Sequence, residues 1–436
     1  MNRSTKRSLI NIFIVVFLDL LGFGLILPLL PFYAADFNAT PTVVGLLTAS
    51  YAAAQLIGAP LLGRLSDKYG RRPILLLSIL GTALSLLMLG FAEPLGVSLA
   101  GITGLALAPV TVTVLFISRI LDGLTGGNIS VAQAYIADVT DEKSRAQGLG
   151  LIGAAFGLGF IAGPALGALL SDIPALLPLL DQYGLSRYAV PAFVAAFLSF
   201  MNLLGVFISL PESLTTEARS RMSTRQNSSM SIGALLEAFT RPKVGPLLHT
   251  RFFFGIAFAM LQTIFPLYSQ YKLGLDARGT GFILTYVGLL SVLVQGVGVG
   301  QLTKRFPEDR LVLFSVGLMS VGLLGWAFTP NWQIILVVLA PVSLAGGVLN
   351  TVLSSLLSKS VEPDEIGGIL GISTSVESAT RTISPSLGGV LLGQLGPAAP
   401  GIFGALVTAS LVPFVWRKVV SKDATPDDLV KAGAGD

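Results

Sequence analysis

Long apolar segments separated by short polar ones constrain this 436-residue chain more than any other feature. A helix needs about 20 apolar residues to cross the hydrocarbon core of a bilayer. Charged residues make up 12% of the chain, against about 25% in soluble domains. The segments that are long and apolar enough to span lie at residues 9–33, 41–63, 73–92, 107–137, 146–170, 190–210, 246–271, 280–302, 310–328, 332–357, 366–392 and 398–416. We therefore predict an all-α membrane protein with twelve transmembrane helices.

The Lys and Arg residues predict how these helices are oriented. If the amino terminus is cytoplasmic, the tails and the loops on that side hold 22 of the 28 Lys and Arg residues, and the opposite loops hold only Arg187, Lys272 and Arg278. Because cations are retained on the cytoplasmic side, we expect a multi-pass protein of the cell membrane with both termini cytoplasmic. The first segment is longer than the apolar core of a signal peptide and contains Asp19, so we expect it to remain as a span.

The two halves of the chain repeat each other. Residues 141–170 align with residues 362–391 at an offset of 221, so that Pro164 meets Pro385. Two six-span repeats related by an axis along the membrane normal are typical of transporters, which bind substrate near the midplane between the repeats. The predicted parts are an amino-terminal six-helix bundle at 1–210, a cytoplasmic linker at 211–245, a carboxy-terminal six-helix bundle at 246–417 and a cytoplasmic tail at 418–436.

One polar loop carries a dense pattern of charge. The string GRLSDKYGRR, residues 63–72, places four cations and one acid between the second and third apolar segments. It resembles the loop signature of the major facilitator superfamily, and the matching residues are Gly63, Asp67, Lys68, Gly70, Arg71 and Arg72. The resemblance implies a twelve-helix transporter made of two six-helix pseudo-repeats.

Two further motifs resemble proton-coupled members of this superfamily. RILDGLTGG, residues 119–127, resembles the fourth-helix motif, with Arg119 and Gly123 in the defining positions. DLLGFGLILPLLP, residues 19–31, resembles the first helix of the twelve-span drug:proton antiporters, and the tetracycline exporters most closely. Those exporters carry an Asp in the third span and a His in the eighth, whereas this chain has Ser85 and no ionisable residue there.

The fifth apolar segment resembles the antiporter motif of the drug exporters. It reads GLGFIAGPALG, with Ala168 where a second Gly is usual, and its motif residues are Gly157, Gly159, Gly163, Pro164 and Gly167. The resemblance implies that these residues restrict leak during exchange. The alternative is that they serve helix packing alone, since GxxxG spacing lets helices approach closely.

Charged residues inside the spans are costly to bury and usually face a cavity or a partner. Arg119 and Asp122 are three residues apart, and Glu377 and Arg381 four apart, so each pair shares a helix face and can form an ion pair. Such pairs are either structural or part of proton coupling. Asp19 has no partner within one turn of its own helix and is our first candidate for the proton carrier. Its alternative role is a hydrogen bond to a neighbouring helix.

Uncharged amides at membrane depth are candidate substrate contacts, because they line water or bond across helices. They are Gln55, Asn128, Gln133, Gln262, Gln295 and Asn350. A mainly apolar cavity with few amides suits an amphiphilic, drug-like molecule better than a sugar.

The charged loop is also a candidate cytoplasmic gate. Arg71 and Arg72 can reach the acidic inner end of the fourth span, and contacts of this kind close one side of a transporter in one of its two states. The predicted gate consists of Gly63, Asp67, Lys68, Gly70, Arg71, Arg72 and Asp138. The alternative is that these cations only fix the topology.

The residues that are missing exclude other functions. The chain has no Cys, one His, no P-loop and no hydrolase motif, so we expect neither an enzyme nor a metal or other cofactor. We expect a monomer in the lipid bilayer that exchanges a small molecule for protons and does not bind nucleic acid. Its function would be drug-resistance efflux of the tetracycline-exporter kind, by alternating access. The alternative is a proton symporter or uniporter of a small metabolite.

Overall fold

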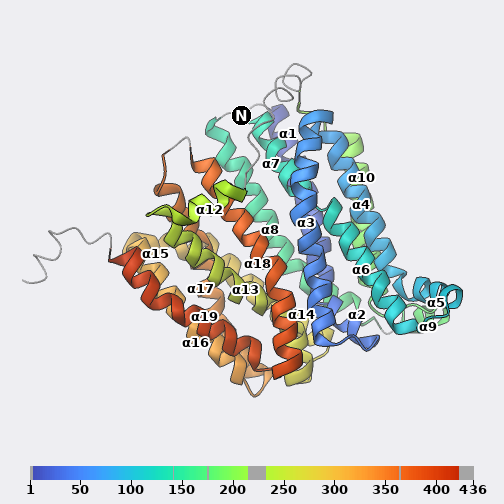
Figure 1. Ribbon diagram of the computed structural model, residues 1–436. Helices are drawn as coiled ribbons and strands as arrows, with labels where there is room; N and C mark the ends of the chain where they lie inside the picture. The colour runs from blue at the N-terminus through green and yellow to red at the C-terminus, as the bar shows by residue number, and fades with distance from the viewer. Residues whose placement is uncertain (1–2, 141, 174–175, 215–231, 363–364, 422–436) are drawn as a thin grey trace, which may run out of the picture. The chain divides into compact units, whose positions relative to one another are not determined.

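The computed structural model describes residues 3–140, 142–173, 176–214, 232–362 and 365–421, and nearly all of them are helical (Figure 1). The chain separates into two compact units. Unit 1 contains residues 1–228, 263–288 and 385–393, and unit 2 contains residues 229–262, 289–384 and 394–436.

The first ten helices lie in unit 1. They are α1 (Arg3–Ile26), α2 (Leu30–Asp36), α3 (Pro41–Tyr69), α4 (Arg71–Gly90), α5 (Ala92–Thr103), α6 (Leu107–Thr125), α7 (Asn128–Val139), α8 (Glu142–Leu170), α9 (Leu177–Gln182) and α10 (Ala189–Ser209).

The remaining helices follow α10 in the sequence, and the first of them, α12, lies inside the predicted linker at 211–245. They are α12 (Ile232–Thr240), α13 (Val244–Leu273), α14 (Ala277–Leu293), the π-helix η1 (Val294–Gly298), α15 (Val299–Arg305), α16 (Glu308–Phe328), α17 (Trp332–Lys359), α18 (Ile366–Leu395), α19 (Ala399–Val415) and the π-helix η2 (Trp416–Val420).

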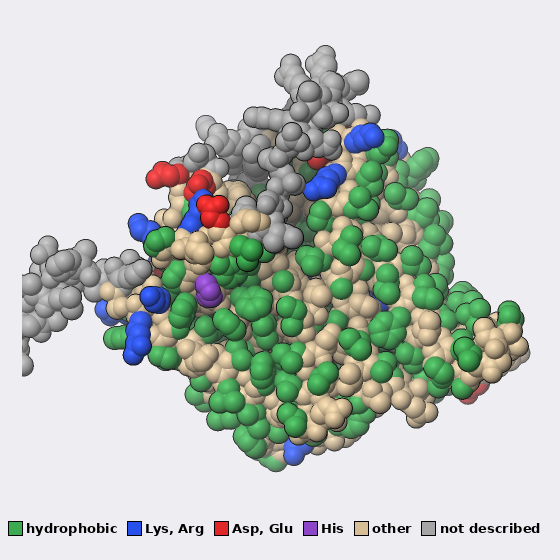
Figure 2. Space-filling model, in the orientation of Figure 1, with side chains coloured by type: hydrophobic (Ala, Val, Ile, Leu, Met, Phe, Trp, Pro, Cys, Tyr) green, Lys and Arg blue, Asp and Glu red, His purple; other side chains and the backbone are tan. Residues whose placement is uncertain are grey.

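Eleven candidate spans in the described residues are long and apolar enough to cross a membrane. They match eleven of the twelve predicted segments, and α18 occupies the place of the remaining one. The middle of α18 carries Glu377, Arg381 and a run of Ser and Thr residues, which lowers its hydropathy. The prediction of an all-α membrane protein is confirmed. On the face drawn in Figure 2, hydrophobic side chains cover much of the surface, as lipid contact requires.

Two of the candidate spans are broken helices. The first continues from α1 into α2 through residues 27–29, and the fourth continues from α6 into α7 through Gly126 and Gly127. A break frees backbone groups that need partners inside a membrane. The side chain of Gln55 on α3 donates to the Gly126 carbonyl at 2.8 Å and so satisfies one of them.

The core of unit 1 forms where α1, α4, α7, α8 and α10 pack against one another. Val16, Ile79, Tyr135 and Ala155 belong to its buried cluster. The Tyr135 hydroxyl donates to the Pro211 carbonyl at 3.1 Å, so this large ring is buried without leaving its polar atom unpaired.

Glycines allow α1 and α8 to pack closely. A Cβ atom on Gly163 would lie 2.6 Å from the backbone of Gly24, and one on Gly167 would lie 2.5 Å from the Leu25 carbonyl oxygen. A Cβ atom on Gly159 would lie 2.9 Å from the Leu20 side chain. The backbones are therefore too close for any larger residue, which is the geometry that GxxxG spacing predicts.

In unit 2, α16 packs between α17 and α19. Trp326 of α16 is fully buried, and a Cβ atom on Gly401 of α19 would lie 2.9 Å from the Ala327 side chain. These contacts fix one side of unit 2. Residues 244–262 of α13 and residues 366–384 of α18 also belong to this unit, and they carry Arg251, Glu377 and Arg381.

Candidate functional site

A buried ion pair lies inside unit 1 on α6. Nη1 of Arg119 is 3.1 Å from Oδ2 of Asp122, and both side chains are less than 10% exposed. Ser118 donates to the Ser85 carbonyl at 2.8 Å, which ties α6 to α4 next to the pair. Ser85 of α4 is fully buried, and its side chain lies beside the Asp122 carboxylate.

Asp19 of α1 is the acid of this group for which the described residues provide no cation. Its described electrostatic neighbours are Asp122 and the side chain of Asn128, the first residue of α7. Asn128 is fully buried, yet neither its side-chain nitrogen nor its oxygen makes a hydrogen bond of good geometry. Among the described residues, an acid without a cation and an incompletely bonded amide therefore lie together at the break between α6 and α7.

Aromatic rings adjoin Asp19. Phe23 lies one turn further along α1, with its ring centroid 5.1 Å from Tyr51 and 6.2 Å from Phe160. The amide of Gln55 reaches the Tyr51 hydroxyl at 3.2 Å. This surface offers aromatic faces, one amide and one acid, a composition suited to an amphiphilic molecule.

A second charged cluster lies in unit 2. Glu377 of α18 accepts from Arg381 on its own helix at 2.6 Å and from Arg251 of α13 at 3.0 Å. Arg251 also donates to the Ser354 hydroxyl at 3.1 Å and to the Asn350 carbonyl at 3.5 Å, both on α17. Arg251 was not among the sequence candidates. It lies only about 10 Å from the start of its helix. An arginine so near a helix end usually extends its side chain to the membrane surface, so the sequence offers no reason to place it in a buried cluster.

The six predicted amide residues are not all in one place. Gln55 and Asn128 lie in the amino-terminal group. Asn350 joins the Arg251 cluster through its backbone carbonyl, not through its side-chain amide. Gln262 is half-buried, whereas Gln133 and Gln295 are exposed on α7 and η1. A single sequence shows that an amide occurs in a span but not which way it faces.

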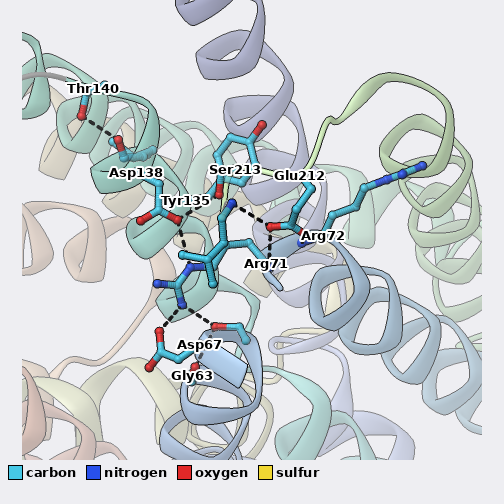
Figure 3. A network of polar contacts seen from close by, with 12 residues as sticks. Gly63, Asp67, Arg71, Arg72, Tyr135, Asp138, Thr140, Glu212 and Ser213 are labelled. Carbon is cyan, nitrogen blue, oxygen red and sulfur yellow. Dashed lines mark hydrogen bonds and ion pairs between the residues drawn. The ribbon is translucent and has the colours of Figure 1, made fainter. Parts of the chain in front are cut away.

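The charged loop forms a network around Arg71 at the start of α4 (Figure 3). Its guanidinium contacts Asp67 at 2.5 Å through Nη1 and Asp138 at 3.1 Å through Nε, and it donates to the Ser66 hydroxyl at 2.7 Å. Ser213 donates to the same Asp138 oxygen at 2.9 Å. All of these residues belong to unit 1.

The other residues of the loop have different surroundings. Arg72 donates to the Phe207 carbonyl at 2.6 Å and lies over the Phe207 ring, away from Asp138. Lys68 is exposed, with its Nζ atom 5.1 Å from the centroid of the Tyr69 ring. Gly63 accepts a hydrogen bond from the Ser66 hydroxyl at 2.7 Å. Gly70 has φ of 108°, a conformation that side-chain-bearing residues rarely adopt, and it makes the turn between α3 and α4.

Glu212, which follows α10, is a further residue of this network. Its carboxylate accepts from the backbone N–H groups of Arg71 and Arg72 at 2.9 and 3.1 Å, and so caps the amino terminus of α4 (Figure 3). Gly70 has no side chain to provide that cap. The uncapped helix start is visible in the sequence, but its distant partner is not.

Membrane-spanning helices that bury charges along their inner faces are typical of membrane transporters. Residues 12–330 and 251–433 match the Major Facilitator Superfamily, and the chain belongs to this superfamily. The protein is therefore a multi-pass membrane transporter of small molecules and not an enzyme.

The chain is 33% identical over 386 residues to the tetracycline resistance protein, class H, of Pasteurella multocida, and the match covers 88% of each chain. It also resembles the crystal structure of a bacterial homolog of the human lysosomal transporter Spinster, with a TM-score of 0.73, 13% identity and coverage of 98% and 100%. For the human organic anion transporter MFSD10 the TM-score is 0.63, with 22% identity and coverage of 95% and 100%. At these identities the two structures show the shared fold alone.

Proposed function

We propose that this transporter is a proton-coupled antiporter that exports a small amphiphilic molecule by alternating access. The observation that carries the proposal is the group formed by Asp19, Asn128 and the Arg119–Asp122 ion pair. Protonation of Asp19 would remove a charge from membrane depth next to Asp122, so each proton bound changes the free energy of this group. Phe23, whose ring adjoins those of Tyr51 and Phe160, lies one turn along α1 from that acid.

The glycines of α8, the fifth predicted span, support antiport. Gly159, Gly163 and Gly167 hold α8 against α1, the helix that carries Asp19. Their proposed role is to keep this seam closed so that protons do not leak past Asp19. The relatives named as tetracycline resistance proteins support export as the direction of transport. An inward proton releases about 2.3 kcal/mol per 100 mV of membrane potential, which is enough for roughly a fiftyfold substrate gradient.

The proposal includes an orientation and a gate. Both termini lie in the cytoplasm, and the protein acts as a monomer. The network of Asp67, Arg71 and Asp138 closes the cytoplasmic side in one of the two states and opens in the other. The six-helix halves at 1–210 and 246–417 are the moving parts, with the linker at 211–245 between them.

The experiment is proton-driven uptake into everted membrane vesicles, measured with fluorescent amphiphiles and with tetracycline. We expect accumulation that collapses when the pH gradient is abolished. In Asp19→Asn the acid is permanently neutral, so accumulation against a gradient should be lost while substrate binding remains. A stably folded Asp19→Asn protein that still concentrates substrate contradicts the assigned role of Asp19. Proton and substrate moving in the same direction identify the alternative, a symporter.

A further inference from the structure

The charge cluster of unit 2 is unbalanced. Arg251 and Arg381 share the single carboxylate of Glu377, at 3.0 and 2.6 Å, which leaves one net positive charge. In the carboxy-terminal half of the sequence, residues 246–417, no other Asp or Glu falls inside a predicted span, because the remaining acids lie in loops or at helix ends. No acid within those spans can neutralise the second guanidinium.

This charge lies deep along its helix. Arg381 is the sixteenth of the 30 residues of α18, about 22 Å from the start of the helix and about 21 Å from its end. Its side chain is 44% exposed. An exposed guanidinium at that depth is strongly disfavoured in hydrocarbon, so this face of α18 must border water or a polar ligand. Ser and Thr residues dominate the same stretch of the helix, from Ser373 to Ser384.

Arg251 has hydrogen-bonding capacity to spare. Its side chain is 10% exposed, and its Nε atom has no hydrogen-bond partner among the described residues. Buried guanidinium N–H groups are normally paired, so an unpaired one next to an exposed cation marks a place for an acceptor.

The helix that carries Arg251 also presents an apolar surface. Phe258 and Gln262 follow Arg251 at intervals of seven and four residues, and therefore lie on the same face of α13. The Phe258 ring is half-buried and stacks on Phe254 with 5.5 Å between centroids. A cation, an aromatic ring and an amide thus follow one another along one face.

We propose that Arg381 and Arg251 bind the anionic group of the transported molecule, and that the substrate class is an amphiphilic organic anion. A carboxylate, sulfonate or phosphate accepts paired hydrogen bonds from guanidinium groups, and Phe258 takes the apolar body. This inference deepens the proposed function and rests on it for the direction of transport only. Glu377 occupies the two guanidinium groups when no substrate is bound, and the incoming anion competes with it.

The test measures binding without any proton gradient. The full-length protein, purified into nanodiscs of phosphatidylcholine, is titrated with three probes of nearly equal shape: naphthoate, naphthalenesulfonate and the neutral naphthamide. Binding is followed by quenching of tryptophan fluorescence and by thermal stabilisation. We expect the two anions to bind more tightly than the amide.

Three variants separate an anion site from a structural ion cluster. Arg381→Gln should weaken naphthoate binding about tenfold or more, the cost of one charge-assisted hydrogen bond, and leave naphthamide unchanged. Glu377→Gln removes the competing carboxylate and should strengthen naphthoate binding in the fraction that remains folded. A purely structural cluster predicts no gain in that variant. Arg305→Gln changes an exposed arginine at the end of α15 and should alter neither probe.

The proposal is overturned if the anions bind no better than the amide, or if Arg381→Gln weakens both to the same extent. Phosphatidylglycerol added to the nanodiscs identifies the source of the anion, since displacement of naphthoate that depends on Arg381 assigns the site to a lipid headgroup and overturns a small organic substrate. Because binding needs no gradient, a protein that binds naphthoate but shows no proton-driven transport contradicts the proposed function and not this site.

Discussion

The carboxylate of Glu212 accepts a hydrogen bond from the backbone N–H of Arg71 at 2.9 Å, although 141 positions separate the two residues in the sequence. The same carboxylate bonds the next N–H, that of Arg72. Glu212, which follows α10, therefore caps the amino terminus of α4, the third predicted span. Arg71 and Ser213, the neighbour of Glu212, both contact Asp138.

Glu212→Ala should destabilise the protein. The variant removes a cap from the positive end of α4, which typically costs about 0.5–2 kcal/mol. Thermal unfolding of the purified protein in detergent is the measurement. Glu237→Ala is the matched control, because Glu237 is exposed on α12 and no side-chain bond of it is described. Equal melting temperatures for the two variants would show that the cap contributes nothing to stability.

Asp67→Asn tests the gate. It keeps the size of the side chain but removes the charge that faces Arg71 at 2.5 Å. If this pair closes the cytoplasmic side, transport should fall by about tenfold, equivalent to about 1.4 kcal/mol, at normal expression. Vesicle transport per folded molecule is the measurement, and Asp309→Asn at the start of α16 is the control. Normal transport by Asp67→Asn would leave the loop as a topology signal alone.

Gly163→Ala tests the contact between α1 and α8. The added methyl group would lie 2.6 Å from the backbone of Gly24, so the helices must separate, at a cost of about 1–3 kcal/mol. Gly153→Ala on the same helix has no atom within 4 Å of the new methyl group and should be neutral or slightly stabilising. Melting temperature and proton leak in vesicles check the pair. The packing role is wrong if both variants behave alike.

Glu93 predicts a dependence of stability on pH. Partial burial, reinforced by the nearby Asp36 and Asp181, raises the pKa of this carboxyl above its ordinary value of 4.5. Between those two pKa values the folded protein holds more protons than the unfolded chain, so stability falls as pH rises through that window. Glu93→Gln cannot ionise and should be more heat-stable than the parent at about pH 7, with the difference vanishing at about pH 4. A difference that is constant with pH would exclude this cause.

The sequence alone predicted those contacts that join neighbouring turns of one helix. The pairs Arg119–Asp122 and Glu377–Arg381 follow from spacing, and both ion pairs are present in the structure. The fold class and most span boundaries follow in the same way, because apolar length is a property of each segment alone.

Contacts between different helices could not be predicted from the sequence. Arg251 meets Glu377 across 126 positions, and the periodicity of one helix contains no information about the helix next to it. The partner of Arg71 at Glu212 was missed for the same reason. The position of Asn128 beside Asp19 also depends on where the fourth span breaks, and the sequence predicted that span as a continuous segment.

The break at Gly126 and Gly127 divides the fourth span into two helices, α6 and α7. Arg119 and Asp122 lie on α6 before the break, and Asp138 lies on α7 after it. The contact between Asp138 and Arg71 and the buried Arg119–Asp122 pair therefore belong to different helices of this span. The side chain of Gln55 on α3 donates a hydrogen bond to the Gly126 carbonyl and so ties this break to α3. If the proposed gate opens by a movement of α7, a substitution that makes α6 and α7 one continuous helix should block transport while the charged residues keep their positions.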